Sequence, residues 1–68
     1  MRLSLNGVDQ ELPDGASLTT AVAAGGVAAE ARGVAVAVDG EVIPRARWEA
    51  TTLREGQRVE ILQAVGGG

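Results

Sequence analysis

The sequence predicts an α+β domain in which a mixed sheet of about five strands curls around one main helix. Three observations predict it: two short alternating apolar stretches flank an Asn-Gly pair, one brief helical pattern follows, and further β-branched stretches complete the chain. With 68 residues and 46% apolar residues, the chain is globular and near the lower size at which one core folds unaided. We expect one domain over residues 1–63 and a flexible Gly-rich tail over residues 64–68.

An antiparallel hairpin is predicted from Arg2 to Leu12. Asn6-Gly7 suits the two-residue type I′ turn, because both central positions of that turn need positive φ. Strand alternation then assigns one face of the hairpin to the core. The residues expected on that face are Leu3, Leu5, Val8 and Leu12.

One helix is predicted from Leu18 to about Ala24. Ser17 is a suitable N-cap, and Gly25-Gly26 is a suitable C-terminal stop. The apolar stripe of the helix should face the hairpin. The following segment, residues 27–33, is compatible with either another helical turn or a loop.

The second half of the chain predicts three more strands. Val34–Val38 is a predicted strand of alternating Val and Ala, and the pattern does not decide which of the two faces the core. A tight turn at Asp39-Gly40 leads to a short strand over residues 41–43, which Pro44 ends. Residues 45–53 are irregular or one helical turn. The last strand, 58–62, should point Val59 and Ile61 inward and Leu62 outward.

This order of elements fits the β-grasp, in which a hairpin is followed by a helix that crosses over to further strands. A ferredoxin-like βαββαβ arrangement is the alternative, but it needs a second full helix. Residues 45–53 are too short and too polar to supply one.

The residue types that are absent exclude several kinds of site. There is no His, Cys, Lys or Tyr, so the usual general base, thiolate nucleophile and soft metal ligands are missing. No catalytic residue and no metal ligand is therefore assigned, and an enzyme is disfavoured. We expect four acidic side chains to be solvated and not catalytic: Asp9, Glu11, Asp39 and Glu41. Trp48 is expected to cover one end of the core.

Charge and hydropathy also limit the partners. The net charge is −3 and no basic stripe is present, so nucleic acid is not an expected partner. No apolar run has the length of a membrane span, and no signal peptide is recognisable, so the cytoplasm is the expected location and a free monomer the expected state.

The chain ends in Ala-Val-Gly-Gly-Gly. Extended, residues 64–68 reach roughly 15 Å at about 3.3 Å per residue, and glycines without Cβ atoms thread a narrow channel. We therefore expect Gly66 and Gly67 to thread a partner's active site and Gly68 to present its carboxylate there. Leu62 and Val65, two exposed apolar residues beside the tail, are the predicted docking residues.

Three segments in register resemble the ThiS family of sulfur carrier proteins in thiamine thiazole biosynthesis. They are Val-Ile-Pro-Arg-x-x-Trp (Val42 to Trp48), Leu-x-x-Gly-x-x-Val-Glu-Ile (Leu53 to Ile61) and the terminal Gly67-Gly68. The resemblance covers essentially the whole chain and implies a ubiquitin-like β-grasp fold. Such carriers typically place a bulkier polar residue before the Gly pair, where this chain has Gly66.

The resemblance also implies a cycle at Gly68. An adenylating enzyme of the ThiF type uses Mg-ATP to convert the Gly68 carboxylate to an acyl-adenylate. Sulfur from cysteine, delivered through a cysteine desulfurase persulfide, displaces AMP and leaves a thiocarboxylate. Thiazole synthase (ThiG) then accepts that sulfur. The carrier binds no cofactor of its own and contributes no catalytic side chain.

Three other functions compete with this one. A MoaD-like carrier uses the same terminal chemistry for molybdopterin synthesis, but those proteins tend to be longer and to carry aromatic residues near the tail. A ubiquitin-like modifier would form isopeptide bonds through Gly68. A plain interaction module would have an inert tail, and deletion of Gly67 and Gly68 would leave its binding intact.

Overall fold

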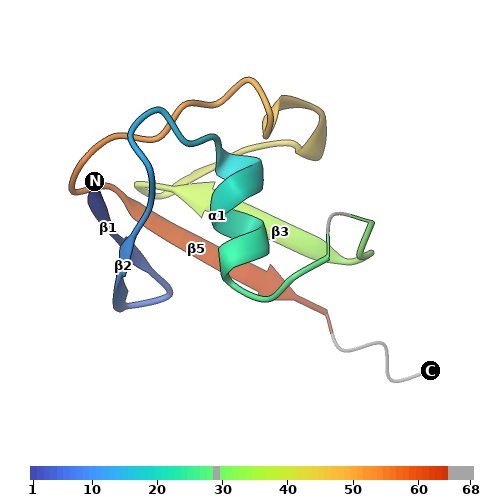
Figure 1. The fold of residues 1–68 in the computed structure, drawn as a ribbon. Coiled ribbons are helices and arrows are strands. Elements are labelled where there is room, and N and C mark those ends of the chain that lie inside the picture. Colours follow the sequence, from blue (N-terminus) through green and yellow to red (C-terminus); the bar gives the residue numbers. More distant parts are fainter. Residues whose placement is uncertain (29, 65–68) are drawn as a thin grey trace.

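The computed structural model describes residues 1–28 and 30–64. In this part of the chain, a five-stranded sheet has the order β2-β1-β5-β3-β4, and one α-helix packs across one of its faces (Figure 1). The elements are β1 (Arg2–Leu5), β2 (Val8–Glu11), α1 (Leu18–Ala24), β3 (Val34–Val38), β4 (Glu41–Val42), the 3₁₀ helix η1 (Arg45–Arg47) and β5 (Arg58–Gln63).

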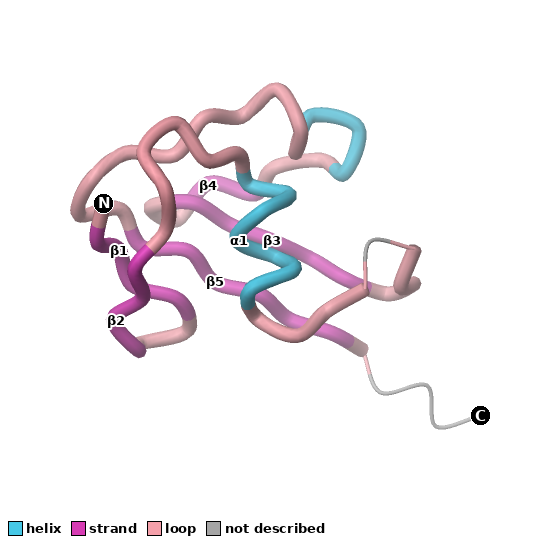
Figure 2. Tube along the Cα trace, in the orientation of Figure 1, coloured by secondary structure: helices cyan, strands magenta, loops and turns pink. Residues whose placement is uncertain are grey.

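The sheet is mixed, as predicted. β5 lies in its centre, parallel to β1 and antiparallel to β3 (Figure 2). The remaining pairs, β1 with β2 and β3 with β4, are antiparallel hairpins. This arrangement is the β-grasp, and the ferredoxin-like alternative is excluded because the segment after β4 forms only the three-residue η1.

Both tight turns form where the sequence predicts them. Asn6 and Gly7 have φ values of 51° and 82°, and Asp39 and Gly40 have φ values of 50° and 85°. Positive φ at both central positions is the requirement of the type I′ turn, whose twist matches that of the flanking strands. The turns therefore set the registers Leu5 opposite Val8 and, in the second hairpin, Val38 opposite Glu41.

Helix α1 begins and ends at the predicted residues. The Ser17 hydroxyl accepts a hydrogen bond from the Thr20 N–H at 3.4 Å, which is the N-cap interaction. Gly26 adopts a φ of 84° just beyond the helix. The described residues of the segment 27–33 form turns and bends, so of the two possibilities the loop is correct.

The core is aliphatic and lies between α1 and the sheet. Leu18, Ala21 and Val22 of the helix are buried against side chains of β1, β3 and β5. Trp48 is buried at 4% exposure, and its indole N–H donates to the Ile43 carbonyl at 2.9 Å. The structural role expected of Trp48 is confirmed.

One predicted core residue is exposed. Val8 lies opposite Leu5 in the hairpin, as the pattern requires, but its side chain is 63% exposed. β2 is an edge strand, and α1 packs over the inner strands and not over this edge. The prediction that Val8 belongs to the core is therefore wrong, whereas Leu3, Leu5 and Leu12 are buried as expected.

Candidate functional site

Strand β5 carries the chain toward its C-terminal residues and is held on both sides. Five of its residues lie opposite residues of β3 in register, and its first two residues pair with β1. Ala64, the first residue of the predicted tail, donates its N–H to the Gly33 carbonyl at 2.8 Å. The described chain therefore stays attached to the body as far as Ala64.

Four predicted site residues lie outside the described residues: Val65, Gly66, Gly67 and Gly68. The fifth, Leu62, lies on the face of the sheet opposite α1 and is 74% exposed. Val59 is fully buried and Ile61 is 8% exposed on the helix side, so the predicted facing of the last strand is confirmed.

An apolar groove crosses the open face of the sheet beside Leu62. Leu62 pairs with Ala35, and Ala37 pairs with Val42, which is 69% exposed. The two small alanines between the larger side chains leave a hollow of about 180 Å³. We call the surface formed by Leu62, Ala35, Ala37 and Val42 the open-face groove.

Sequence reasoning missed Val42 as part of this surface. Val42 reads as one residue of a short return strand, and only strand register shows that it shares a face with Leu62. The alternation of small alanines between valines in β3 was the available signal, because it marks one face with little side-chain volume.

Asn6 supports β5 where β1 ends, which was also missed. Its side-chain N–H donates to the Ile61 carbonyl at 3.1 Å, and its side-chain oxygen accepts the Ile61 N–H at 2.7 Å. The amide thus continues the hydrogen-bonding pattern of β1 for one residue after the backbone turns away. The only sequence signal was an Asn where the turn also accepts Gly.

The loop before β3 is fixed to η1 by Arg45. The Arg45 guanidinium donates to the Ala31 carbonyl and lies 4.9 Å from the centroid of the Trp48 ring. That loop ends at Gly33, which holds Ala64. Contacts therefore run from the buried Trp48 to the loop that holds Ala64, the residue after β5.

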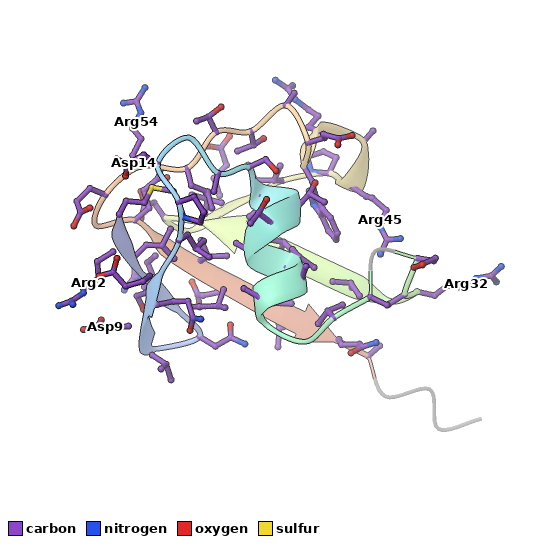
Figure 3. All side chains as sticks on the ribbon, in the orientation of Figure 1. Arg2, Asp9, Asp14, Arg32, Arg45 and Arg54 are labelled. Carbon is purple, nitrogen blue, oxygen red and sulfur yellow. The ribbon has the colours of Figure 1, made fainter. Side chains whose placement is uncertain are left out.

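The charged side chains do not converge on a reaction centre in residues 1–28 and 30–64. No group of three or more Asp and Glu side chains in that part of the chain could hold a metal ion. Arg2, Asp9, Arg32 and Arg54 project outward at the periphery (Figure 3).

Asp39, one of the carboxylates considered above, has a structural role. Its side chain accepts the Arg58 N–H at 2.9 Å and so fixes the start of β5.

Among the described residues, no helix is both long and apolar enough to cross a membrane.

Comparison with known proteins agrees with this architecture. A search of curated proteins found no match. Two solved structures of a thiamine biosynthesis protein from Geobacter metallireducens match all of this chain at 36% identity. The crystal structure, described as ThiS, has a TM-score of 0.79 with 100% of its chain covered, and the NMR solution structure has a TM-score of 0.78 with 88% covered. The model of the ThiS family matches residues 3–68, and the chain belongs to the ThiS family.

Proposed function

We propose that the protein is a sulfur carrier of thiamine biosynthesis and that the Gly68 carboxylate is the group that carries the sulfur. The observation that supports this most is the family match, which extends through residue 68 and so includes the terminal glycines. In this function the chain is a protein cosubstrate, and the catalytic side chains belong to the enzymes that act on it.

The proposed chemistry begins with a carboxylate that is a poor electrophile, because it is ionised at neutral pH. An adenylating enzyme of the ThiF type joins the Gly68 carboxylate to the AMP part of Mg-ATP and releases pyrophosphate. A persulfide sulfur from a cysteine desulfurase then attacks the carbonyl carbon and expels AMP. A thiol cleaves the resulting disulfide, which leaves the Gly68 thiocarboxylate as the donor for thiazole synthase.

The described part of the molecule suits a carrier in two ways. First, the central strand β5, which leads to the tail, is bonded to neighbours on both sides, so the base of the tail is held by the body. Second, the open-face groove presents Leu62 in solvent two residues before Ala64, with the exposed Val42 further along the same face. We propose that the adenylating enzyme docks on this groove, with Leu62 and Val65 as contacts, while Gly66 and Gly67 thread its active site.

The position of the carboxylate tests this proposal. One alanine added after Gly68 should abolish formation of the acyl-adenylate by the adenylating enzyme, because the terminal carboxylate is displaced by about 3.3 Å and no longer belongs to glycine. The measurement is pyrophosphate release with Mg-ATP, and the unmodified chain is the positive control. Equal pyrophosphate release from both chains would contradict the proposed role of Gly68.

A variant that lacks Gly67 and Gly68 distinguishes the sulfur-carrier function from that of a plain interaction module. For a carrier this chain should still bind the adenylating enzyme through the groove, with a weaker affinity, and release no pyrophosphate. Unchanged affinity and unchanged pathway activity in a thiamine-requiring strain would instead support the module.

A further inference from the structure

Among the described residues, strand β5 has one backbone position whose N–H and C=O meet neither a neighbouring strand nor a side chain. Its N–H and C=O groups alternate between its two neighbours. Arg58 and Ala64 bond to the side of β3, and the carbonyls of Gln57 and Val59 accept from β1. By this alternation the N–H and C=O of Gln63 point to the β1 side.

β1 does not extend far enough to reach Gln63. Its last pair with β5 is Leu5 opposite Val59, and the chain then turns away at Asn6. The Asn6 side chain covers Ile61, the next position along this edge. Among the described residues no strand reaches this side of Gln63 and no side chain bonds to its N–H or C=O, and Gln63 is exposed.

A hollow of about 440 Å³ on the open face of the sheet reaches Leu62, the residue before Gln63. Its lining residues are Asn6, Gly7, Arg58, Glu60, Ile61 and Leu62. Because successive side chains of a strand point to opposite faces, a strand laid beside Gln63 would direct a side chain into this hollow. Leu62 belongs to the open-face groove, and Glu60 lines this hollow and the hollow of that groove, so the two surfaces are continuous.

We propose that the free edge of β5 at Gln63 binds an extended backbone segment of the adenylating enzyme. This inference rests on the proposed function and names how that partner binds. An exposed strand edge is a template for an added strand, whose main-chain hydrogen bonds supply affinity. The added segment accepts the Gln63 N–H and donates to the Gln63 C=O, beside the contacts at Leu62.

The distance between β5 and Gly68 along the chain favours this occupant over others. Gly68 lies four residues after Ala64, and four fully extended residues span about 13 Å at about 3.3 Å per residue. An enzyme that activates the Gly68 carboxylate must therefore approach to within this distance of the end of β5. The Gln63 edge and the adjoining hollow lie inside the surface that such an enzyme covers.

Gln63→Pro tests the proposal, because proline removes the N–H at position 63 and is tolerated on an unpaired strand edge. The bonds from Ala64 to Gly33 and from β5 to β3 use other positions and remain. Gln63→Ala is the matched control, since it truncates the same side chain and keeps the N–H. We expect Gln63→Pro to weaken binding to the purified adenylating enzyme about three- to tenfold by calorimetry, and Gln63→Ala to bind like the natural chain.

A synthetic chain carrying N-methylglutamine at position 63 repeats the test without the proline ring, and Trp48 fluorescence checks that each variant is folded. If the natural chain neither binds nor is adenylated, the proposed function fails. If the natural chain is adenylated and the folded proline and N-methyl variants bind equally well, the edge proposal alone is wrong. It is also wrong if the natural chain self-associates in sedimentation experiments, these variants do not, and enzyme binding is the same for both.

Discussion

Gly33 meets two separate requirements at the residue scale. Its φ of 69° lies in the left-handed region, which side chains with a Cβ seldom adopt. A Cβ built at Gly33 would also lie 3.1 Å from the Cβ of Ala64, closer than ordinary van der Waals contact. Any side chain at this position would therefore strain the backbone and press on the base of the tail.

Gly33→Ala should therefore destabilise the fold more than the same substitution at a glycine that has a positive φ but no close neighbour at its Cβ position. Gly15 is the matched control, with a φ of 83° and open space around its Cβ position. We expect Gly15→Ala to cost about 1–2 kcal/mol of unfolding free energy and Gly33→Ala to cost more, in urea titrations. Equal costs would show that the contact with Ala64 contributes nothing.

Residue-scale predictions from sequence succeeded where the requirement was local. The Asn6-Gly7 turn was predictable because Asn and Gly themselves tolerate the positive φ that the turn needs. The bonds from the Asn6 side chain to Ile61 were not, because the two residues are 55 positions apart. Only the fold brings that amide beside β5.

At the scale of elements, β5 combines a buried face with an exposed one. Its alternation of apolar and polar residues made this predictable, and Leu62 is the one large apolar residue on its exposed face. The edge position of β2 was not predictable from alternation, which explains why Val8 was assigned to the core. Alternation gives the face of a strand, and the order of strands decides whether that face is covered.

Leu62→Glu should weaken binding to the adenylating enzyme and leave folding nearly unchanged. The side chain is 74% exposed, so its replacement costs within about 0.5 kcal/mol of stability, while a carboxylate in an apolar contact is costly. Val8→Glu is the control, because Val8 is 63% exposed on another face. Titration calorimetry gives the affinity, and equal binding by both variants would place the docking surface elsewhere.

The N-terminus of β1 is held by charge. The Met1 ammonium donates to the Leu12 carbonyl at 2.7 Å and lies 3.1 Å from a carboxylate oxygen of Asp14. The hydrogen bond with Asp14 raises the pKa of this ammonium above its ordinary value of 8.0, against a smaller opposing effect of desolvation. The folded chain therefore binds this proton more tightly than the unfolded chain does.

This linkage predicts a loss of stability in base. The contribution is fully present below about pH 8 and is lost as pH rises through the higher pKa of the folded state. Asp14→Asn should flatten the dependence of unfolding free energy on pH between about pH 7 and pH 10. Urea titrations across this range measure it, and identical slopes in the two proteins would contradict the role of Asp14.

At the scale of the whole molecule, stability rests on one small aliphatic core with a single aromatic residue. A 68-residue domain has a total unfolding free energy of about 3–10 kcal/mol. Replacing a buried tryptophan by alanine costs about 3–5 kcal/mol. Trp48 thus contributes an amount comparable to the whole stability of the domain.

Trp48→Ala should therefore be largely unfolded or near its unfolding midpoint at 25 °C. Circular dichroism during urea titration measures this, with Val42→Ala as a control at an exposed position. Trp48→Ala with a urea midpoint like that of the natural chain would contradict the account of the core.

The order of elements along the chain was enough to predict the β-grasp, since short connections leave few topologies. The proposed docking surface was only half predictable. Leu62 follows from the alternation of one strand, but Val42 and the free edge at Gln63 depend on how far four strands extend past one another. Those lengths and registers are set by tertiary packing and not by local pattern.

The central claim is that Gly68 carries sulfur, and the mass of the intact protein tests it most directly. The purified chain is incubated with Mg-ATP, the adenylating enzyme, a cysteine-fed desulfurase and a thiol, and a chain without Gly67 and Gly68 is the control. We expect a mass increase equal to the replacement of one oxygen by sulfur, located on the fragment that ends at Gly68 and absent from the control. An unchanged mass in the presence of an enzyme that forms the adenylate, or sulfur located elsewhere on the chain, would contradict the role of Gly68.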